Sequence, residues 1–322
     1  MIQFSVSDFS LKDTLECGQT FRWRRAQALP APRTSGQGKA RQAGDGWYYG
    51  FIPVRPEPGR MGGGPCAVKA GQDGSRLTVL TMDPRLTPEA VHRYFALDID
   101  LPAILSAIDV DAQIHDAIDR HRGLRILRQD PWECLASFIL SSFNNIKRIQ
   151  GMIERLSQAY GTASSFNGFQ GFAFPSAEAI ARVPERRLRQ LGLGYRAPYL
   201  KDTAKAVAGG AFSIAAVARA DYAATKTALL QCDGVGDKVA DCVALFGFEK
   251  YEAFPVDVWM ERAMRYYFRR RTPTRSKVHA FARQHFGRYA GYAQQYLYQY
   301  VRNARFAPVG LAVTAGWDAQ MN

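Results

Sequence analysis

A Gly-Val-Gly turn at residues 234–236 constrains the fold of this chain more than any other segment. An apolar helical stretch ends just before it, near Leu230, and a new helical pattern begins immediately after it at Asp237. Two glycines let the backbone reverse tightly and approach another group closely. The segment therefore predicts two helices joined by a short hairpin. The free N–H groups at the start of the second helix would suit an anion such as a phosphate, although a purely structural turn is the commoner use of this pattern.

The balance of charged residues favours a polyanionic partner. The 322-residue chain has 42 Lys and Arg against 29 Asp and Glu, a formal net charge of +13. A basic surface neutralises phosphates and releases their counterions, so nucleic acid is the commonest partner of such a protein. Charge alone leaves a protein that is simply basic and soluble as an equally good explanation.

The cysteines indicate neither a disulfide framework nor a metal centre. Their number is odd, and no two of them stand at Cys-x-x-Cys spacing: Cys17, Cys66, Cys134, Cys232 and Cys242. We therefore expect a reducing compartment, with neither structural zinc nor an iron–sulfur cluster. Residues 1–6 lack the basic and apolar regions of a signal peptide. No run approaches the ~20 apolar residues of a membrane span, so we expect no membrane association.

Hydrophobic periodicity divides the chain near residue 100. Strand-like runs occur at 47–52 and 77–82, with a weaker one at 20–24. The segments 26–46 and 55–76 are rich in Gly, Pro, Arg and Gln, and we expect both to be long exposed loops. Beyond residue 100 the pattern becomes helical. A small α/β lobe followed by a helical bundle is therefore expected.

The helical part has clear start and stop signals. Asp130-Pro131-Trp132-Glu133 combines an N-cap, a proline at the first position and a capping-box glutamate. Gly161 ends the next helical pattern, and Gly192 and Gly194 mark a turn. The expected helices that follow Asp130 cover residues 146–160, 176–191, 197–208, 222–230, 237–246, 258–268 and 289–302.

Lys238 stands in the first turn of the helix after the hairpin. A cation there meets the unfavourable end of the helix macrodipole, which favours the neutral amine. A neutral amine is a nucleophile, whereas an ammonium is not. A phosphate-binding or solvated lysine is the more usual role at a hairpin position. Cys242 follows four residues later and shares a helix face with Lys238.

A second chemical candidate lies in the segment Phe254-Pro255-Val256-Asp257-Val258-Trp259-Met260. An Asp after Pro-x is a natural helix N-cap. The alternative is a carboxylate beside Lys238, which would stabilise positive charge on a sugar and help to move protons.

Further segments in chain order complete a resemblance. They are residues 18–23 (Gly-Gln-Thr-Phe-Arg-Trp), 129–134 (Gln-Asp-Pro-Trp-Glu-Cys), 141–146 (Ser-Ser-Phe-Asn-Asn-Ile), 191–196 (Leu-Gly-Leu-Gly-Tyr-Arg) and 289–294 (Tyr-Ala-Gly-Tyr-Ala-Gln). With the hairpin, Lys238 and Asp257, they resemble the helix–hairpin–helix (HhH-GPD) glycosylase superfamily, and within it the eukaryotic-type 8-oxoguanine DNA glycosylase/AP lyase. The resemblance spans nearly the whole chain, apart from the two breaker-rich segments.

This resemblance implies an α+β fold and a repair activity. Residues 1–105 would form an N-terminal antiparallel, TBP-like sheet lobe, and residues 106–322 an all-α helix–hairpin–helix domain, with duplex DNA bound across the cleft. The enzyme would remove 8-oxoguanine, opposite cytosine, through a lysine Schiff base. It would then cut the strand by β-elimination.

The resemblance also assigns roles to residues. Lys238 would be the nucleophile and Asp257 the essential carboxylate. The flipped base would be recognised by Gly18, Cys242, Gln294, Tyr298 and Pro255. The Gly18 carbonyl would accept the N7–H that only the oxidised guanine has, because normal guanine has an acceptor at N7. Gln294 and Tyr298, at i and i+4, would read the Watson–Crick edge and stack on the base.

Two further groups of residues would hold the DNA. The wedge and the contacts to the opposite base would come from Phe143, Asn144, Arg148, Tyr195 and Arg196. The phosphate contacts would come from Gly234, Val235, Gly236 and Trp259. This chain departs from the family where Phe143 replaces an asparagine, Trp259 a histidine and Asp233 the hairpin proline. Phe143 can stack but cannot hydrogen-bond a cytosine.

Two alternatives remain open. One is a helix–hairpin–helix glycosylase for another lesion, although the lack of cluster cysteines argues against the iron–sulfur branches and Lys238 against purely monofunctional enzymes. The other is a non-catalytic DNA-binding protein, which would explain the charge and the two hairpin glycines. It would leave the coincidence of Lys238, Asp257, Gly18 and Gln294 unexplained.

The resemblance completes the expected partners and setting. No redox cofactor or catalytic metal is required, and hairpin carbonyls would at most hold a structural alkali-metal ion. The partner would be double-stranded DNA with an oxidised purine, bound by a monomer. We expect the cytoplasm, with its nucleoid, if the source is bacterial, and the nucleus if it is eukaryotic.

Overall fold

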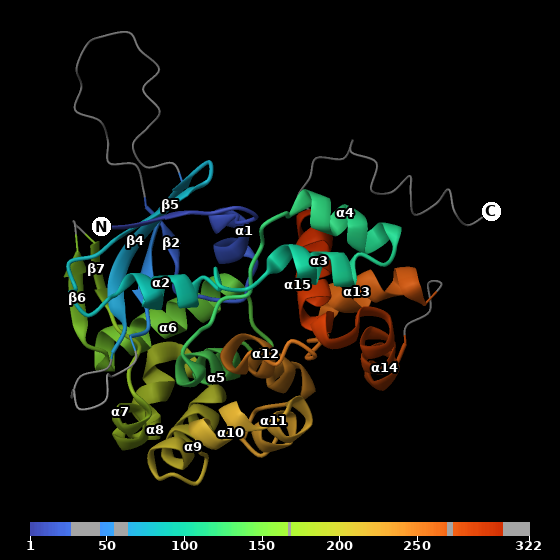
Figure 1. Ribbon diagram of the computed structural model, residues 1–322. Helices are drawn as coiled ribbons and strands as arrows, with labels where there is room; N and C mark the ends of the chain where they lie inside the picture. Colours follow the sequence, from blue (N-terminus) through green and yellow to red (C-terminus); the bar gives the residue numbers. More distant parts are fainter. Residues whose placement is uncertain (27–45, 55–63, 167–168, 269–272, 305–322) are drawn as a thin grey trace.

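The structure is a computed structural model that describes residues 1–26, 46–54, 64–166, 169–268 and 273–304. An N-terminal lobe built on an antiparallel sheet lies beside a larger helical part (Figure 1). This arrangement confirms the expected α+β fold. Among the described residues, none of the helices is long and apolar enough to cross a membrane.

The N-terminal lobe is a five-stranded sheet in the order β1-β5-β4-β3-β2. Its neighbouring strands are antiparallel throughout. The strands are β1 (Ile2–Ser5), β2 (Arg24–Arg25), β3 (Trp47–Ile52), β4 (Cys66–Asp73) and β5 (Arg76–Leu80). Two helices that the strand-rich pattern did not predict complete the lobe, α1 (Leu11–Glu16) and α2 (Pro88–Tyr94).

The central strand β4 corrects one expectation. Residues 66–73 fall within the segment 55–76 that we expected to be an exposed loop, yet they pair with β3 on one side and β5 on the other. The small residues of this segment are typical of a loop, but here they are required by packing within the sheet. A Cβ on Gly71 would lie 2.5 Å from the Trp47 ring, so only glycine fits beneath the indole. The expected loop 26–46 lies almost entirely outside the described residues.

The helical part begins at residue 101 and wraps around a long hydrophobic core. Its helices are α3 (Leu101–Ile108), α4 (Ala112–Arg120), α5 (Pro131–Leu140), α6 (Ile146–Tyr160), α7 (Ala177–Arg182), α8 (Glu185–Leu188), the π-helical turn η1 (Arg189–Leu193), α9 (Arg196–Ala208), α10 (Ile214–Arg219), α11 (Tyr222–Leu229), α12 (Asp237–Phe248), α13 (Val258–Tyr267), α14 (Arg275–Phe286), the 3₁₀ turn η2 (Gly287–Tyr289) and α15 (Ala290–Ala304). The Asp130 cap is confirmed, since its carboxylate accepts the Glu133 N–H at 2.9 Å.

Two details differ from the expected helical pattern. The helix expected over 176–191 is broken between α7 and α8, because Val183 is extended before Pro184. The part expected to be all-α also contains a β-hairpin of β6 (Ala163–Phe166) and β7 (Phe169–Phe172). Phe166 of this hairpin packs with Phe51 and Ala67 of the sheet, so the hairpin ties the helical part to the N-terminal lobe.

Helix α15 joins the two parts at the position of the candidate site. The Gln295 side chain donates to the Cys17 carbonyl at 2.9 Å, and Arg302 donates to the Glu16 carbonyl at 3.0 Å. The segment that follows α1 is thus held against α15, although the two are almost 280 residues apart in the chain. Gly18, which comes next, is placed by these contacts.

Candidate active site

The predicted hairpin is present between α11 and α12. Gly234 has φ +78, in the left-handed region, and a Cβ there would lie 2.5 Å from the Tyr199 ring. Gly236 is the extended N-cap of α12, and no side chain in the described part of the chain caps the helix. The first amides of α12 therefore lie at an open helix end (Gly236 has nothing within 4 Å of where its Cβ would be). Val235 between them is buried and anchors the turn.

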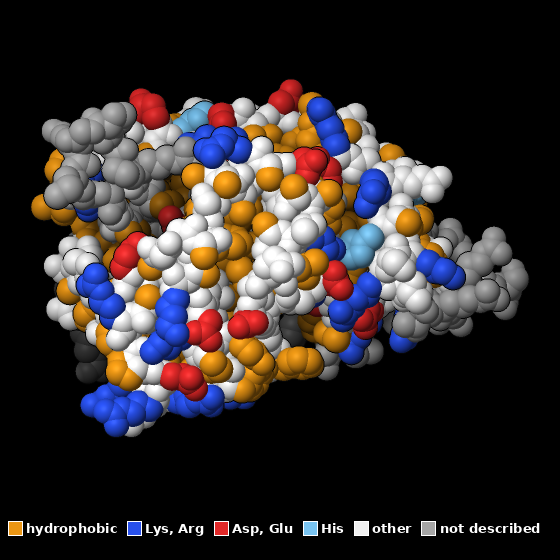
Figure 2. Space-filling view, turned by 90° about the horizontal axis from the view of Figure 1, so that it is seen from below, with side chains coloured by type: hydrophobic (Ala, Val, Ile, Leu, Met, Phe, Trp, Pro, Cys, Tyr) orange, Lys and Arg blue, Asp and Glu red, His pale blue; other side chains and the backbone are white. Residues whose placement is uncertain are grey.

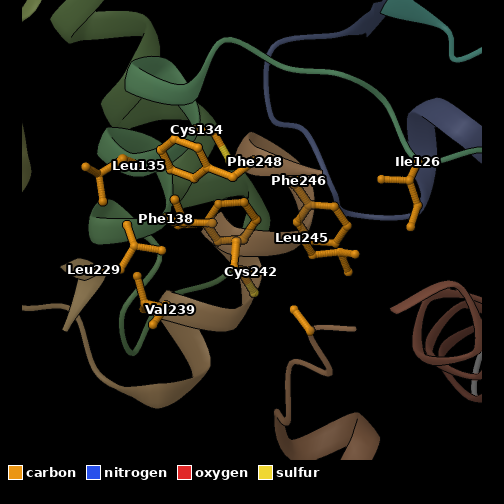
Figure 3. Close-up of a cluster of buried hydrophobic side chains, with 14 of the residues drawn as sticks. Ile126, Cys134, Leu135, Phe138, Leu229, Val239, Cys242, Leu245, Phe246 and Phe248 are labelled. Atoms are coloured by element: carbon orange, nitrogen blue, oxygen red, sulfur yellow. The ribbon is translucent and has the colours of Figure 1, made fainter. Parts of the chain in front are cut away.

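Lys238 lies in the first turn of α12, half-buried. Its ammonium is 5.2 Å from the centre of the Phe138 ring on α5, within the range of a cation–π contact. Cys242 and Phe138 belong to the same cluster of buried hydrophobic side chains (Figure 3). Burial raises the pKa of that thiol to about 11, which the Lys238 charge opposes and the Asp257 charge reinforces. Lys238, Cys242 and Asp257 are therefore close enough to interact.

Asp257 is the N-cap of α13, as its position after Pro-x predicts. Its Oδ1 accepts from the Trp259 amide at 3.0 Å and from the Met260 amide at 2.9 Å. The carboxylate is also within electrostatic reach of Cys242 and Tyr298. The N-cap role and a role beside Lys238 are thus compatible, because the cap fixes the carboxylate at the edge of the same cluster. Pro255, two residues earlier, is buried.

Gly18 and Tyr298 lie next to each other. Gly18 has φ +83, and a Cβ added to it would lie 3.4 Å from the Tyr298 hydroxyl. Burial raises the pKa of Tyr298 above its usual range, and the Asp257 charge adds to the increase. The phenol is therefore neutral over the physiological range.

Gln294 lies one turn before Tyr298 on α15, so the two share a face as predicted. The Gln294 residue is only 4% exposed. Its Oε1 is buried and has no hydrogen-bond partner among the residues that the structure describes. An unpaired buried carbonyl costs about 1–3 kcal/mol, so an amide held in this way is suited to a ligand that brings a donor.

Three residues that we did not predict support the Gly18 segment. Gln19 is fully buried; its amide donates to the Thr14 and Arg125 carbonyls, both at 2.8 Å, and accepts from the Leu127 N–H at 2.8 Å. Gln295 and Arg302 hold the preceding carbonyls, as described above. The sequence does contain two adjacent glutamines in a helix, Gln294 and Gln295. We predicted a role only for Gln294.

The proposed wedge residues come from two loops in contact. Phe143 lies between α5 and α6, is 98% exposed and has φ +46. Arg196 is only 5% exposed, and its guanidinium donates to the Ser142 and Phe143 carbonyls. The Tyr195 hydroxyl also donates to the Ser142 carbonyl, at 3.1 Å. Arg196 therefore holds the backbone of an exposed ring in a conformation that a phenylalanine rarely adopts.

The remaining wedge candidates differ in their engagement. The Asn144 amide donates to the Leu140 carbonyl at 3.1 Å and accepts from the Asn145 N–H, so it stabilises the end of α5. Arg148 is exposed in the first turn of α6. Tyr195 is 46% exposed. The Arg196 guanidinium lies over the Tyr195 ring, 4.3 Å from the centre of that ring. Phe143, Tyr195 and Arg148 thus remain accessible, whereas Asn144 and Arg196 also serve the backbone.

Trp259 lies at the start of α13, beside Asp257. It is half-buried, and the Arg262 guanidinium lies 4.9 Å from its ring centre. Figure 2 shows one face of the molecule, on which Lys and Arg side chains are interspersed with Asp and Glu. The net positive charge is therefore not gathered into one uniform patch on that face. Among the described residues no three His, Cys, Asp or Glu side chains are grouped to hold a metal ion.

Two family models match the chain. One describes HhH-GPD superfamily base excision DNA repair proteins and matches residues 136–287. The other describes the 8-oxoguanine DNA glycosylase N-terminal domain and matches residues 1–37 and 73–135.

Similar proteins extend over almost the whole chain. A probable N-glycosylase/DNA lyase from Methanothermobacter thermautotrophicus is 32% identical over 94% of this chain and 96% of its own length. N-glycosylase/DNA lyase OGG1 of Arabidopsis thaliana is 30% identical, over 92% and 78%. The solved Clostridium acetobutylicum 8-oxoguanine glycosylase/lyase, in complex with double-stranded DNA containing cytosine opposite 8-oxoguanine, has a TM-score of 0.81 and 30% identity, over 93% of this chain and 94% of that one. The chain belongs to the 8-oxoguanine DNA glycosylase family of the HhH-GPD superfamily.

Proposed function

We propose that this chain is a DNA glycosylase/AP lyase that removes 8-oxoguanine from duplex DNA during base excision repair. The observation that carries the proposal is the buried Oε1 of Gln294, which has no partner among the described residues and lies on α15 one turn before Tyr298, the neighbour of Gly18. The Watson–Crick edge of a flipped guanine would bring N–H donors to this oxygen. The Gly18 carbonyl would accept the N7–H of the oxidised base. Tyr298 and Cys242 would enclose the two ring faces, with Pro255 at the edge.

Lys238 would perform the chemistry. Its neutral Nζ attacks C1′ of the sugar, the C1′–N9 bond breaks, and the base leaves with the bonding electrons and takes up a proton. The Asp257 carboxylate stabilises the positive charge that develops on the sugar. Loss of a proton from the amine and opening of the sugar produce a Schiff base at C1′. The imine acidifies the C2′ proton, so its removal expels the 3′ phosphate and nicks the strand.

The two exposed rings would enter the duplex as the lesion flips out. Base flipping costs a few kcal/mol of lost stacking and pairing, and Phe143 and Tyr195 would replace part of that stacking. Arg148, with Asn144 and Arg196 nearby, would contact the orphaned cytosine. The clostridial protein is described with cytosine opposite 8-oxoguanine, which supports cytosine as the preferred opposite base here.

The hairpin would anchor one DNA phosphate. The uncapped amides after Gly234, Val235 and Gly236 supply donors, and the Trp259 indole would supply another.

We infer a monomeric enzyme on duplex DNA that needs no redox cofactor or catalytic metal. The Cys232 carbonyl of the hairpin accepts only the Val235 amide, at 3.1 Å, in the described structure. Its other lone pair would suit a structural alkali-metal ion. The enzyme would work where the chromosome is: with the bacterial nucleoid, or in a eukaryotic nucleus.

Borohydride trapping tests the proposal. The protein would be incubated with duplexes that carry 8-oxoguanine opposite each of the four bases, and then reduced. We expect a covalent adduct that requires both the lesion and Lys238, most abundant opposite cytosine. Lys238→Gln should abolish the adduct while DNA binding persists. Absence of an adduct on all four duplexes, with binding intact, would reject the lyase mechanism and favour a monofunctional glycosylase or a DNA-binding protein.

A further inference from the structure

A buried carboxylate lies on α12 outside the proposed base pocket. Asp241 is fully buried, three residues after Lys238 and one before Cys242. Its carboxylate accepts from the Tyr222 hydroxyl at 2.7 Å and from the Lys226 ammonium at 3.1 Å. The His279 Nε2 atom is 3.4 Å away. One carboxylate thus connects α11, through two side chains, and α14 to α12.

The two faces of α12 have different tasks. Lys238 and Cys242, at i and i+4, lie beside Phe138 and within reach of Asp257. Asp237 and Asp241, also at i and i+4, both lie near Lys226, whose ammonium is 3.6 Å from the Asp237 carboxylate. The Lys226 contacts therefore hold the first turn of α12, which is the turn that carries Lys238. The same contacts span both helices of the hairpin.

The buried carboxylate needs a positive charge close to it. Removing one partner of a buried ion pair is strongly destabilising, because it leaves a buried charge without compensation. Lys226 is the nearest cation, and its side chain is only 19% exposed. Burial raises the pKa of Asp241, and the charge of Lys226 opposes that increase more than any other group does.

His279 is a second group that can supply the charge. The groups that act on it are Asp241 and Asp237 on α12, Lys226 on α11 and Arg283 on its own helix. Burial lowers its pKa, and Lys226 lowers it further. Lys226 thus supplies the charge beside Asp241, and the His279 imidazole is a second group beside the same carboxylate that can take up a proton.

We propose that Lys226, Asp241 and His279 form a positioning network for Lys238. Lys226 supplies the single charge that the Asp241 carboxylate requires, and the carboxylate fixes the first turn of α12 against α11 and α14. His279 replaces Lys226 when the lysine is lost and the pH is low enough to protonate the imidazole. The proposal rests on the function proposed above only in naming Lys238 as the group that is positioned.

Lys226→Met tests the network, because it removes the charge and keeps most of the stem. We expect the single-turnover excision rate at about pH 8 to fall about tenfold or more, since a small displacement of a reacting group is costly. DNA affinity should change much less. At about pH 6, where His279 can protonate, the variant should recover most of its rate relative to the wild type at the same pH. Lys226→Arg should stay near wild type throughout.

Two double variants and a matched control decide the outcome. Lys226→Met with His279→Leu should lose the recovery at low pH; if the recovery persists, the proton is not on His279 and the proposal is wrong. Lys226→Met with Asp241→Asn removes the charge together with its cation, so it should fold well and lack the pH dependence. Lys205→Met is the control, because Lys205 pairs with Asp202 at 2.9 Å on an exposed surface of α9.

Thermal unfolding provides a readout that does not depend on repair activity. In Lys226→Met, His279 would gain a charged partner on folding, so its folded-state pKa would exceed its unfolded value. The resulting stability is present below the unfolded pKa and is lost as the pH rises through the folded value. The midpoint should therefore drop more between about pH 6 and pH 8 than in the wild type. If the midpoint drops equally in the variant and the wild type between these two pH values, the network is rejected, even if 8-oxoguanine is excised as proposed.

Discussion

Gly18 lies directly against Tyr298: a side chain at Gly18 would begin 3.4 Å from the tyrosine hydroxyl, and the glycine backbone has φ +83. The two residues come from opposite ends of the chain. Their contact forms one wall of the proposed base pocket, and the carbonyl of Gly18 is the group proposed to recognise the oxidised base. This contact, the hairpin, the wedge loop and the buried thiols lead to five predictions.

Gly18→Ala should impair excision more than it impairs folding. A left-handed alanine costs about 1–2 kcal/mol, and its methyl group would also push on Tyr298. We expect a lower single-turnover rate on 8-oxoguanine, with nearly unchanged binding of undamaged duplex. Gly210→Ala is the control, because Gly210 has φ +78 and nothing within 4 Å of its Cβ position. Equal loss of activity in both variants would mean that strain alone, and not the pocket, is responsible.

The two hairpin glycines should differ in their effect on stability. Gly234→Ala places a methyl group 2.5 Å from the Tyr199 ring at φ +78, so it should lower the free energy of unfolding by about 2 kcal/mol or more. Gly236→Ala has extended backbone and open space, so its loss should stay below about 1 kcal/mol. Urea unfolding of both variants measures this. Equal destabilisation would contradict the packing of Gly234 on Tyr199.

Arg196 should matter for the shape of the Phe143 loop. Arg196→Met removes the charged donors to the Ser142 and Phe143 carbonyls, and each such hydrogen bond contributes about 1.5–3 kcal/mol. We expect a lower melting temperature and weaker fluorescence of a 2-aminopurine placed next to the lesion, which reports on flipping. The exposed Arg148→Met should leave the melting temperature near wild type. The loop model fails if Arg196→Met melts like the wild type.

The thiol of Cys242 should resist modification in the native protein. Burial raises its pKa to about 11, so at about pH 8 it is protonated and a poor nucleophile. The other four thiols are buried as well. We expect an aromatic disulfide reagent to react only slowly with the native protein. After unfolding, the same reagent should react with all five thiols. Rapid reaction of Cys242 in the native protein would show that the site opens readily.

The same shift predicts a loss of stability in alkali. The folded-state pKa of Cys242 lies above its value in the unfolded chain, so the thiol contributes stability that is complete below the unfolded pKa. That contribution disappears as the pH rises through about 9 towards about 11. Cys242→Ala should therefore flatten the fall of the melting temperature over this interval. An equally steep fall in the variant would assign the effect to the other buried thiols and phenols.

Local features were predictable from the sequence because they depend on residues a few positions apart. The Asp130 and Asp257 caps, the glycine turn at 234–236 and the i, i+4 pair Gln294–Tyr298 all belong to this class. In each, a short side chain caps the first amides of the next helix, glycines permit a tight turn, or one helix places both residues. The strands at 47–52 and 77–82 were predicted for the same reason, although β5 covers Arg76–Leu80 and the partner strand β4 was not predicted.

Only the tertiary structure determined which distant groups meet. The glycine and alanine residues of β4 are typical of a loop in the sequence. In the fold, the Trp47 ring occupies the space above Gly71, so a small residue is needed there. The sequence left Arg196 as a DNA contact, whereas the fold also directs its guanidinium to the backbone of the Phe143 loop. The sequence pattern gave Asp241 no role beyond its place in a helix. In the fold its carboxylate is shared by side chains of α11 and α14, which pack against α12. Such partners are selected by burial and long-range packing, which no local pattern in the chain encodes.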